Sequence, residues 1–111
     1  MGVNETLPKA HQKKSVDERL SAIVHYLIET IGPKRIFLFG SRAKGVSRMG
    51  SDIDLAVEGG RELSFREERK LTEALDRLAG IYSVDLVLME RVDHAFRKMI
   101  EETGQILYEQ D

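Results

Sequence analysis

Apolar residues recur at helical spacing in three segments of the chain, which predicts amphipathic helices over residues 15–31, 64–79 and 91–103. Ser15 and Ser64, each followed three residues later by a glutamate, form capping boxes at the starts of the first two helices. The apolar faces of the three helices are expected to supply much of the core, through Val16, Leu20, Ile23, Val24, Leu27, Ile28, Ile31, Leu71, Ala74, Leu75, Leu78, Val92, Phe96, Met99 and Ile100.

Four shorter segments have the patterns of β-strands, namely residues 36–39, 52–57, 84–88 and 106–108. The first is a continuous apolar run, Ile-Phe-Leu-Phe, that ends at Gly40, which is typical of a buried strand leading into a turn. In the second and third segments, acidic and apolar residues alternate near the start. We therefore expect their apolar residues to face one side of a sheet and their acidic residues to face the other.

The order of the predicted elements is helix, strand, short helix, strand, helix, strand, helix, strand. This order predicts an α+β domain of two layers, a mixed β-sheet with helices packed on one face, and the uncovered face would hold the functional site. A Rossmann fold is the competing architecture. It is rejected because no Gly-x-Gly-x-x-Gly sequence follows a strand and because paired aspartates in mid-strand have no purpose in it.

Two aspartates in the second predicted strand are the main candidates for chemistry. Because strand residues alternate between faces, Asp52 and Asp54 point the same way, with Cα atoms about 7 Å apart. Two such carboxylates repel each other, and Mg²⁺ would neutralise the repulsion while water and substrate phosphate fill its other positions. Asp85 lies on the acidic side of the third strand. If the two strands pair, three carboxylates converge, enough for two metal ions, and Asp85 could also accept the proton of an attacking hydroxyl.

The turn at Gly40 and Ser41 is the candidate phosphate site. Gly40 lets the backbone approach a ligand closely, and a short helix from Ser41 to Ser47 would direct its free N–H groups and its dipole at a triphosphate. Arg42 adds positive charge nearby, and Ser51 is a further candidate for nucleotide contact. These residues and the aspartates together suggest metal-assisted chemistry on a nucleotide.

The segment GSRAKGVSRMGSDIDLAV, with Asp85 downstream, resembles the DNA polymerase β-like nucleotidyltransferases, and specifically their minimal, single-domain prokaryotic branch, the MNT proteins. The similarity extends from about Ile36 to Tyr108. In that family the glycine-serine pair contacts the nucleotide phosphates, the Asp-x-Asp pair holds Mg²⁺, and a third acidic residue completes the metal site. Position by position, the resemblance carries these roles over to Gly40, Ser41, Asp52, Asp54 and Asp85.

The resemblance implies an enzyme with the polymerase β-like fold that uses Mg²⁺ to move AMP from ATP to a hydroxyl acceptor. Similarity to the MNT branch further implies an antitoxin, whose partner is a HEPN-type ribonuclease toxin that it inactivates by placing AMP on a toxin tyrosine. Because a domain without a recognition module must find specificity elsewhere, the brevity of the chain favours a protein partner. Nothing in the sequence distinguishes ATP from GTP.

Two other functions stay open. The protein could neutralise its partner by contact alone, with a metal site that is vestigial or only senses nucleotide, although three intact aspartates argue mildly against this. It could also modify a small molecule such as an aminoglycoside, but members of that class generally carry a second domain for the acceptor, and none is expected here.

Composition limits the classes of protein to which the chain can belong. The chain has 111 residues, of which we assign 1–14 to a loose tail and 15–111 to a single domain. Seventeen basic against nineteen acidic residues give a net charge of −2, which argues against binding to long nucleic acid. The absence of cysteine excludes disulfides and thiolate metal sites, and no apolar run approaches the length of a membrane span. We therefore expect a cytoplasmic protein, with a homo- or hetero-oligomer left open.

Overall fold

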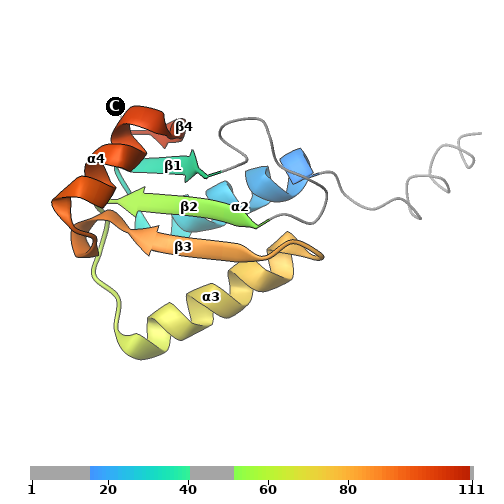
Figure 1. Cartoon of the computed structure of the whole chain (residues 1–111). Helices are drawn as coiled ribbons and strands as arrows, with labels where there is room; N and C mark the ends of the chain where they lie inside the picture. The colour runs from blue at the N-terminus through green and yellow to red at the C-terminus, as the bar shows by residue number, and fades with distance from the viewer. Residues whose placement is uncertain (1–15, 41–51, 111) are drawn as a thin grey trace, which may run out of the picture.

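The computed structural model of the protein describes residues 16–40 and 52–110, which form a four-stranded sheet flanked by helices (Figure 1). The predicted tail over residues 1–14 and the predicted short helix from Ser41 to Ser47 lie outside these described residues. In the described part, the predicted helices and strands are confirmed with small shifts at their ends. The elements are α2 (Val16–Ile31), β1 (Arg35–Phe39), β2 (Ile53–Glu58), α3 (Phe65–Ala79), β3 (Val84–Leu88), the 3₁₀ turn η1 (Met89–Arg91), α4 (His94–Thr103) and β4 (Gln105–Glu109).

The sheet is mixed, as predicted. Its strand order is β3-β2-β1-β4, with β1 antiparallel to both β2 and β4, and with β2 parallel to β3. Because of these directions, β1 ends at the same end of the sheet at which β2 and β3 begin (Figure 1). The Ile53 N–H donates to the Ser83 carbonyl over 2.7 Å, so the pairing of β2 with β3 is fixed from their first residues onward.

The starts of α3 and α4 are defined by side-chain caps. At α3 the Glu67 N–H donates to Ser64 Oγ over 3.2 Å, and the Ser64 N–H donates to Glu67 Oε1 over 2.9 Å, which is the predicted capping box. At α4 the Phe96 N–H donates to Asp93 Oδ1 over 2.8 Å. The predicted start at residue 91 is therefore too early, because Met89–Arg91 forms a separate 3₁₀ turn before this cap.

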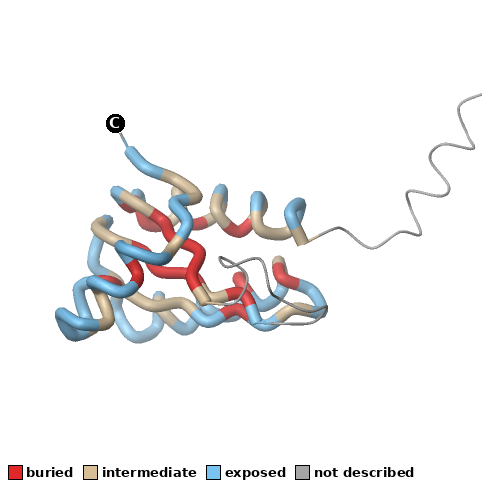
Figure 2. The backbone as a smooth tube through the Cα atoms, turned by 45° about the horizontal axis from the view of Figure 1, so that its top comes forward, coloured by how far each residue is buried: buried red, intermediate tan, exposed pale blue. Residues whose placement is uncertain are grey.

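One face of the sheet is covered by α2 and α3, and the main core lies between these layers. Figure 2 shows the buried residues concentrated in the middle of the molecule. None of the helices in residues 16–40 and 52–110 is long and apolar enough to cross a membrane. The buried members of this core are Ile23, Leu27, Ile31, Ile36, Leu38, Ile53, Leu55, Val57, Leu71, Leu75, Ala79 and Val84.

The last helix, α4, packs on the opposite face of the sheet. Its Ile100 is buried in a second cluster with Phe37, Phe39, Ala56 and Met89. The predicted class is confirmed, but the expectation that all helices cover one face is wrong for α4. The physical reason is that β1 is apolar on both of its sides, so Phe37 and Phe39 need a cover of their own.

Candidate functional site

The starts of β2 and β3 bring two of the predicted site residues side by side. Asp54 and Asp85 are direct register partners in the parallel pair, so they project from the same face of the sheet on strands about 4.8 Å apart. Asp85 is exposed on the outermost strand, whereas Asp54 is partly buried. Asp52 lies just before β2 and is exposed. We call this region, defined by Asp52, Asp54 and Asp85, the acidic end of the sheet.

The charges of Asp52 and Asp85 act on the carboxyl group of Asp54. Burial raises the pKa of the Asp54 carboxyl above its ordinary value, and the negative charges of Asp85 and Asp52 raise this pKa further. The ionised form of Asp54 is therefore disfavoured by its surroundings. A bound cation would remove this penalty, because it would share the negative charge that the carboxylates now face alone.

The acidic end has the donor chemistry for a hard cation, but it is not a complete coordination sphere. Among the residues that the structure describes, no three His, Asp or Glu side chains form a group that could hold a metal ion. Mg²⁺ takes only one or two protein carboxylates in most nucleotide sites and obtains the rest of its ligands from water and phosphate oxygens. The paired oxygens of Asp54 and Asp85 fit that requirement, and the assignment of metal to Asp52, Asp54 and Asp85 stays a prediction.

Gly40 lies directly against Asp54. It follows β1 and adopts a φ of +76°, and a Cβ atom placed on it would collide with Asp54 Oδ2. The backbone conformation therefore favours glycine, and a Cβ atom would force the Asp54 carboxylate to turn away. The structure thus brings together Gly40, Asp54 and Asp85, whereas Ser41, Arg42 and Ser51 lie outside the described residues.

An aromatic pair borders the acidic end, and the sequence assigned it only to the core. Phe39 is the register partner of Asp54 in the β1–β2 pair. The ring of Phe96, from α4, packs edge-on against Phe39 with 5.8 Å between ring centroids. The sequence signal for this neighbour was the position of Phe39 directly before Gly40. Nothing local in the sequence indicated that α4 would bring Phe96 to this face.

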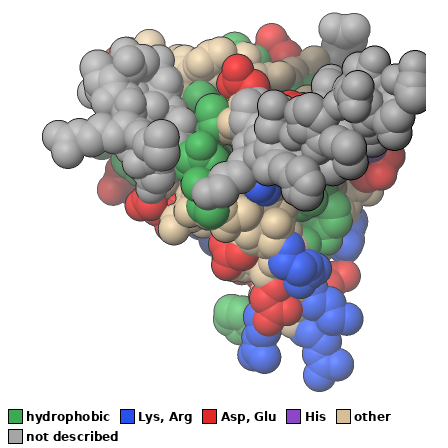
Figure 3. Space-filling view, turned by 90° about the vertical axis from the view of Figure 1, so that its right-hand side faces the viewer, with side chains coloured by type: hydrophobic (Ala, Val, Ile, Leu, Met, Phe, Trp, Pro, Cys, Tyr) green, Lys and Arg blue, Asp and Glu red, His purple; other side chains and the backbone are tan. Residues whose placement is uncertain are grey.

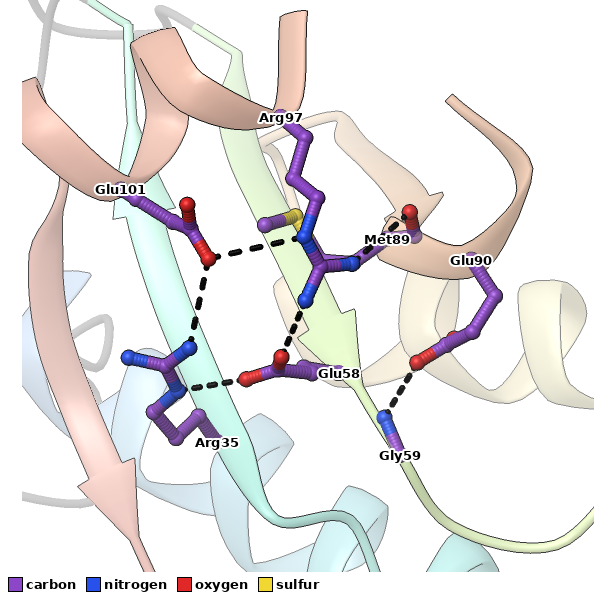
Figure 4. A network of polar contacts seen from close by, with 7 residues as sticks. All are labelled: Arg35, Glu58, Gly59, Met89, Glu90, Arg97 and Glu101. Carbon is purple, nitrogen blue, oxygen red and sulfur yellow. Dashed lines mark hydrogen bonds and ion pairs between the residues drawn. The ribbon is translucent and has the colours of Figure 1, made fainter. Parts of the chain in front are cut away.

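A network of ion pairs fastens α4 to the sheet (Figure 4). Glu58 at the end of β2 accepts hydrogen bonds from Arg35 Nε over 2.5 Å and from Arg97 of α4. Both arginines also contact Glu101, at 3.4 Å and 3.5 Å, and Arg97 donates to the Met89 carbonyl over 3.2 Å. The hydrogen bond from Arg35 lowers the pKa of the Glu58 carboxyl, and the charges of Arg35 and Arg97 act in the same direction. The helix that carries Phe96 is therefore held by charged as well as apolar contacts.

Several basic side chains of the described residues lie on α3. Figure 3 looks onto the end of the molecule at which β2 and β3 begin, and its Lys and Arg side chains gather in the lower part, over α3. A separate pocket at the other end of these strands is lined in part by Arg61 and Arg91. Each of these arginines already pairs with a glutamate, Arg61 with Glu67 at 3.2 Å and Arg91 with Glu68 at 2.5 Å. This pocket is therefore a poorer candidate for binding phosphate.

Residues 21–111 match the protein family described as "Polymerase beta, Nucleotidyltransferase". Because this match spans most of the chain, the protein belongs to the polymerase β nucleotidyltransferase family and is a nucleotidyltransferase by class. The predicted resemblance is thereby confirmed.

Individual relatives place the chain within this family. It is 30% identical over 91 residues to the Haemophilus influenzae protein named "Probable protein adenylyltransferase MntA", covering 81% of this chain and 80% of the relative. A solved structure described as "Crystal structure of the toxin-antitoxin with AMP-PNP" is 27% identical, with a TM-score of 0.66, and covers 81% of this chain and 73% of that one.

A second solved structure contains a tri-AMPylated Shewanella oneidensis HEPN toxin in complex with MNT antitoxin. It is 24% identical with a TM-score of 0.67, covering 86% of this chain and 74% of that one. At this identity the likeness speaks for the fold alone.

Proposed function

We propose that the protein is a Mg²⁺-dependent adenylyltransferase that moves AMP from ATP to the hydroxyl of a tyrosine on a HEPN-type toxin, and that it acts as the antitoxin of that partner. The observation that carries this proposal is the register pairing of Asp54 with Asp85 beside Gly40, at the end where β1 stops and β2 and β3 start. That arrangement supports phosphoryl chemistry because it sets two carboxylates against a turn whose backbone a phosphate can approach closely.

In this proposal, different residues bind the nucleotide, hold the metal ions and accept the proton. Gly40 and Ser41 would contact the phosphates, with Arg42 and Ser51 as further nucleotide contacts. Asp52, Asp54 and Asp85 would hold the ions. Bound magnesium would supply charge neutralisation at the phosphates and at the attacking and leaving oxygens.

In the proposed reaction, the tyrosine oxygen bonds to the α-phosphorus while the bond from that phosphorus to the bridging oxygen of the β-phosphate breaks, and pyrophosphate leaves. The proton of the hydroxyl passes to the Asp85 carboxylate. Asp85 suits this role because it is exposed on an outer strand, where a protein acceptor can reach it.

The names of the relatives support the choice of donor and acceptor. A relative that is 30% identical is named as a protein adenylyltransferase, and a 27% identical neighbour was solved with AMP-PNP, an ATP analogue. The second solved structure contains an AMPylated HEPN toxin beside an MNT antitoxin. A protein acceptor of this kind also accounts for the specificity of a small domain that has little surface of its own for recognition.

The test is to incubate the purified protein and its HEPN partner with α-labelled ATP and Mg²⁺ and to follow label on the toxin. Asp54→Asn and Asp85→Asn are expected to lower the rate by at least about a hundredfold, because each removes a carboxylate at the reacting phosphate. Asp76→Asn is the matched control, since Asp76 is an exposed acid on α3, which covers the opposite face of the sheet. An unlabelled toxin, or equal rates for Asp54→Asn and Asp76→Asn, would count against the proposal.

Neutralisation by contact alone is the second candidate, and the incomplete set of metal-binding side chains among the described residues keeps it in view. The double variant Asp52→Asn with Asp54→Asn separates the two. If it binds the toxin normally and still neutralises it, contact suffices. If it binds but fails to neutralise, transfer is required. Modification of a small molecule is the third candidate, and label on an added aminoglycoside rather than on the toxin would support it.

A further inference from the structure

The second apolar cluster of the fold includes Phe39, the register partner of Asp54, and some of its members are only partly buried. Its members Phe37, Phe39 and Ala56 are buried, whereas Phe96 and Val87 are only partly buried. Val87 stands two positions after Asp85 on the same face of β3, a separation of about 7 Å along the strand. The carboxylates therefore border directly on partly exposed apolar side chains.

The ring of Phe96 is held in place from three directions. Its own backbone N–H is fixed by the Asp93 cap at the start of α4. Its ring packs edge-on against Phe39, whose strand position is opposite Asp54. The next residue, Arg97, joins the ion-pair network that ties α4 to β2. These contacts fix the backbone of Phe96 and place its partly exposed ring beside Phe39, next to the acidic end.

A flat apolar surface beside a phosphate site is suited to a planar ring. We propose that Phe96, supported by Phe39, is the surface against which the nucleobase of the donor nucleotide lies. This inference rests on the proposed function, since it assumes a nucleoside triphosphate with its phosphates at Gly40 and the acidic end. Aromatic side chains stack on every base, so the contact binds ATP and GTP alike and does not select between them.

The nucleobase fits this surface better than the aromatic ring of a protein acceptor does. Phe96 contacts Phe39, the register partner of Asp54, and is therefore on the β1 side of the carboxylates. The acceptor is part of a folded protein and must approach from outside. Asp85, exposed on the outermost strand, marks that open side.

The experiment compares two ligands that differ in the base. Binding of ATP and of inorganic tripolyphosphate, both with Mg²⁺, is measured by titration calorimetry on the wild type and on Phe96→Ala, Phe96→Leu and Phe96→Tyr. We expect Phe96→Ala and Phe96→Leu to weaken ATP binding by about tenfold or more. Tripolyphosphate binding is expected to stay within about twofold, and Phe96→Tyr, which keeps the ring, should bind ATP nearly as the wild type does.

Two controls protect this comparison. Phe65→Ala removes another aromatic ring, one that is 90% exposed at the start of α3, and should change neither affinity. Phe96→Leu retains apolar volume against Phe39, so its thermal melt should stay near that of the wild type even if Phe96→Ala is less stable.

The inference is overturned if ATP binding is unchanged in Phe96→Leu, or if ATP and tripolyphosphate weaken together, because Phe96 would then act only through packing. A rise in KM for the toxin, with KM for ATP unchanged, would also overturn it by assigning the surface to the acceptor. A wild type that binds neither ATP nor tripolyphosphate would instead refute the proposed function. Failure of the inference and failure of the function can therefore be told apart.

Discussion

At the scale of single residues, Gly40 and Asp54 constrain each other. The Oδ2 atom of Asp54 occupies the space that a Cβ atom at position 40 would need. Asp54 can turn toward the end of β1 only because Gly40 has no side chain. The turn and the carboxylate are therefore one structural unit rather than two separate features.

Gly40→Ala is expected to destabilise the fold more than Gly32→Ala. Both glycines have positive φ, +76° and +67°, so alanine is strained at either position. A Cβ at Gly32 would meet nothing within 4 Å, whereas one at Gly40 would collide with Asp54. We expect the extra cost at Gly40 to be about 1–2 kcal/mol by urea denaturation. In an Asp54→Ala background the gap between the two substitutions should close, and a gap that persists would contradict this explanation.

Asp54→Asn is expected to stabilise the metal-free protein while it abolishes transfer. The pKa of Asp54 is raised in the folded state, so the ionised carboxylate costs stability at neutral pH. Removing the charge should raise the Tm of EDTA-treated protein by a few degrees, or about 0.5–1 kcal/mol. Asp52→Asn, at an exposed position, should have a smaller effect. A lower Tm for Asp54→Asn would show that the charge of Asp54 is stabilised in the folded state.

At the scale of elements, α4 is the helix that packs on the sheet face that carries Asp54 and Asp85. It covers Phe37 and Ala56, carries Phe96, and is fastened by the network around Glu58. The Glu58 side chain is only 15% exposed and accepts hydrogen bonds from two arginines, so its charge is compensated within the protein. The ionised form of Glu58 therefore contributes to the attachment of α4 to the sheet.

Glu58→Gln is expected to lower the free energy of unfolding by about 1–3 kcal/mol at pH 7, because two charge-assisted hydrogen bonds are weakened. The pKa of Glu58 is lowered from 4.5 in the folded state, so its contribution is present above that value and is lost as the pH falls through the lower folded pKa. The difference between wild type and variant should therefore shrink below about pH 4.5 in a series of urea denaturations.

The control for Glu58→Gln is an exposed ion pair within α4. Glu102 pairs with Lys98 at 4.0 Å, and both side chains are 63% exposed. Glu102→Gln should cost less than about 0.5 kcal/mol at any pH. Equal effects of Glu58→Gln and Glu102→Gln would mean that the network around Glu58 does not hold α4.

Local patterns predicted the elements and the facing of the acids, but not how the elements are arranged. Alternation alone put Asp54 and Asp85 opposite their apolar neighbours, because the period of a strand is a local property. The pairing of β2 with β3, on which their meeting depends, was an assumption that the register confirms. The prediction of the sheet face that α4 covers was wrong, since an apolar helix face does not specify which sheet face it packs against. The uninterrupted run Ile36–Phe39 was the overlooked signal, because a strand covered on one face alternates.

At the scale of the whole molecule, the sheet separates two tasks. The face under α2 and α3 holds the larger core, and the opposite face holds α4, Phe96 and the acidic end. This division lets the acidic end carry unfavourable charge while the larger core supplies stability from the other side. The charge cost at Asp54 is then a feature that ligand binding should relieve across the whole fold.

Mg²⁺ and ATP together are therefore expected to stabilise the protein more than the sum of either alone. A ligand that binds only the folded state adds about 2.7 kcal/mol at one hundred times its Kd, which corresponds to a rise in Tm of several degrees for a domain of this size. Thermal melts with ATP, with Mg²⁺, with both, and with both plus excess EDTA measure this coupling. Removing the metal with EDTA should reverse most of the rise in Tm. In Asp54→Asn, ATP and Mg²⁺ together should add little beyond their separate effects on Tm, because the charge repulsion at position 54 is already relieved. Equal stabilisation by ATP in Mg²⁺ and in EDTA would mean that the carboxylates of the acidic end do not hold the nucleotide through a metal.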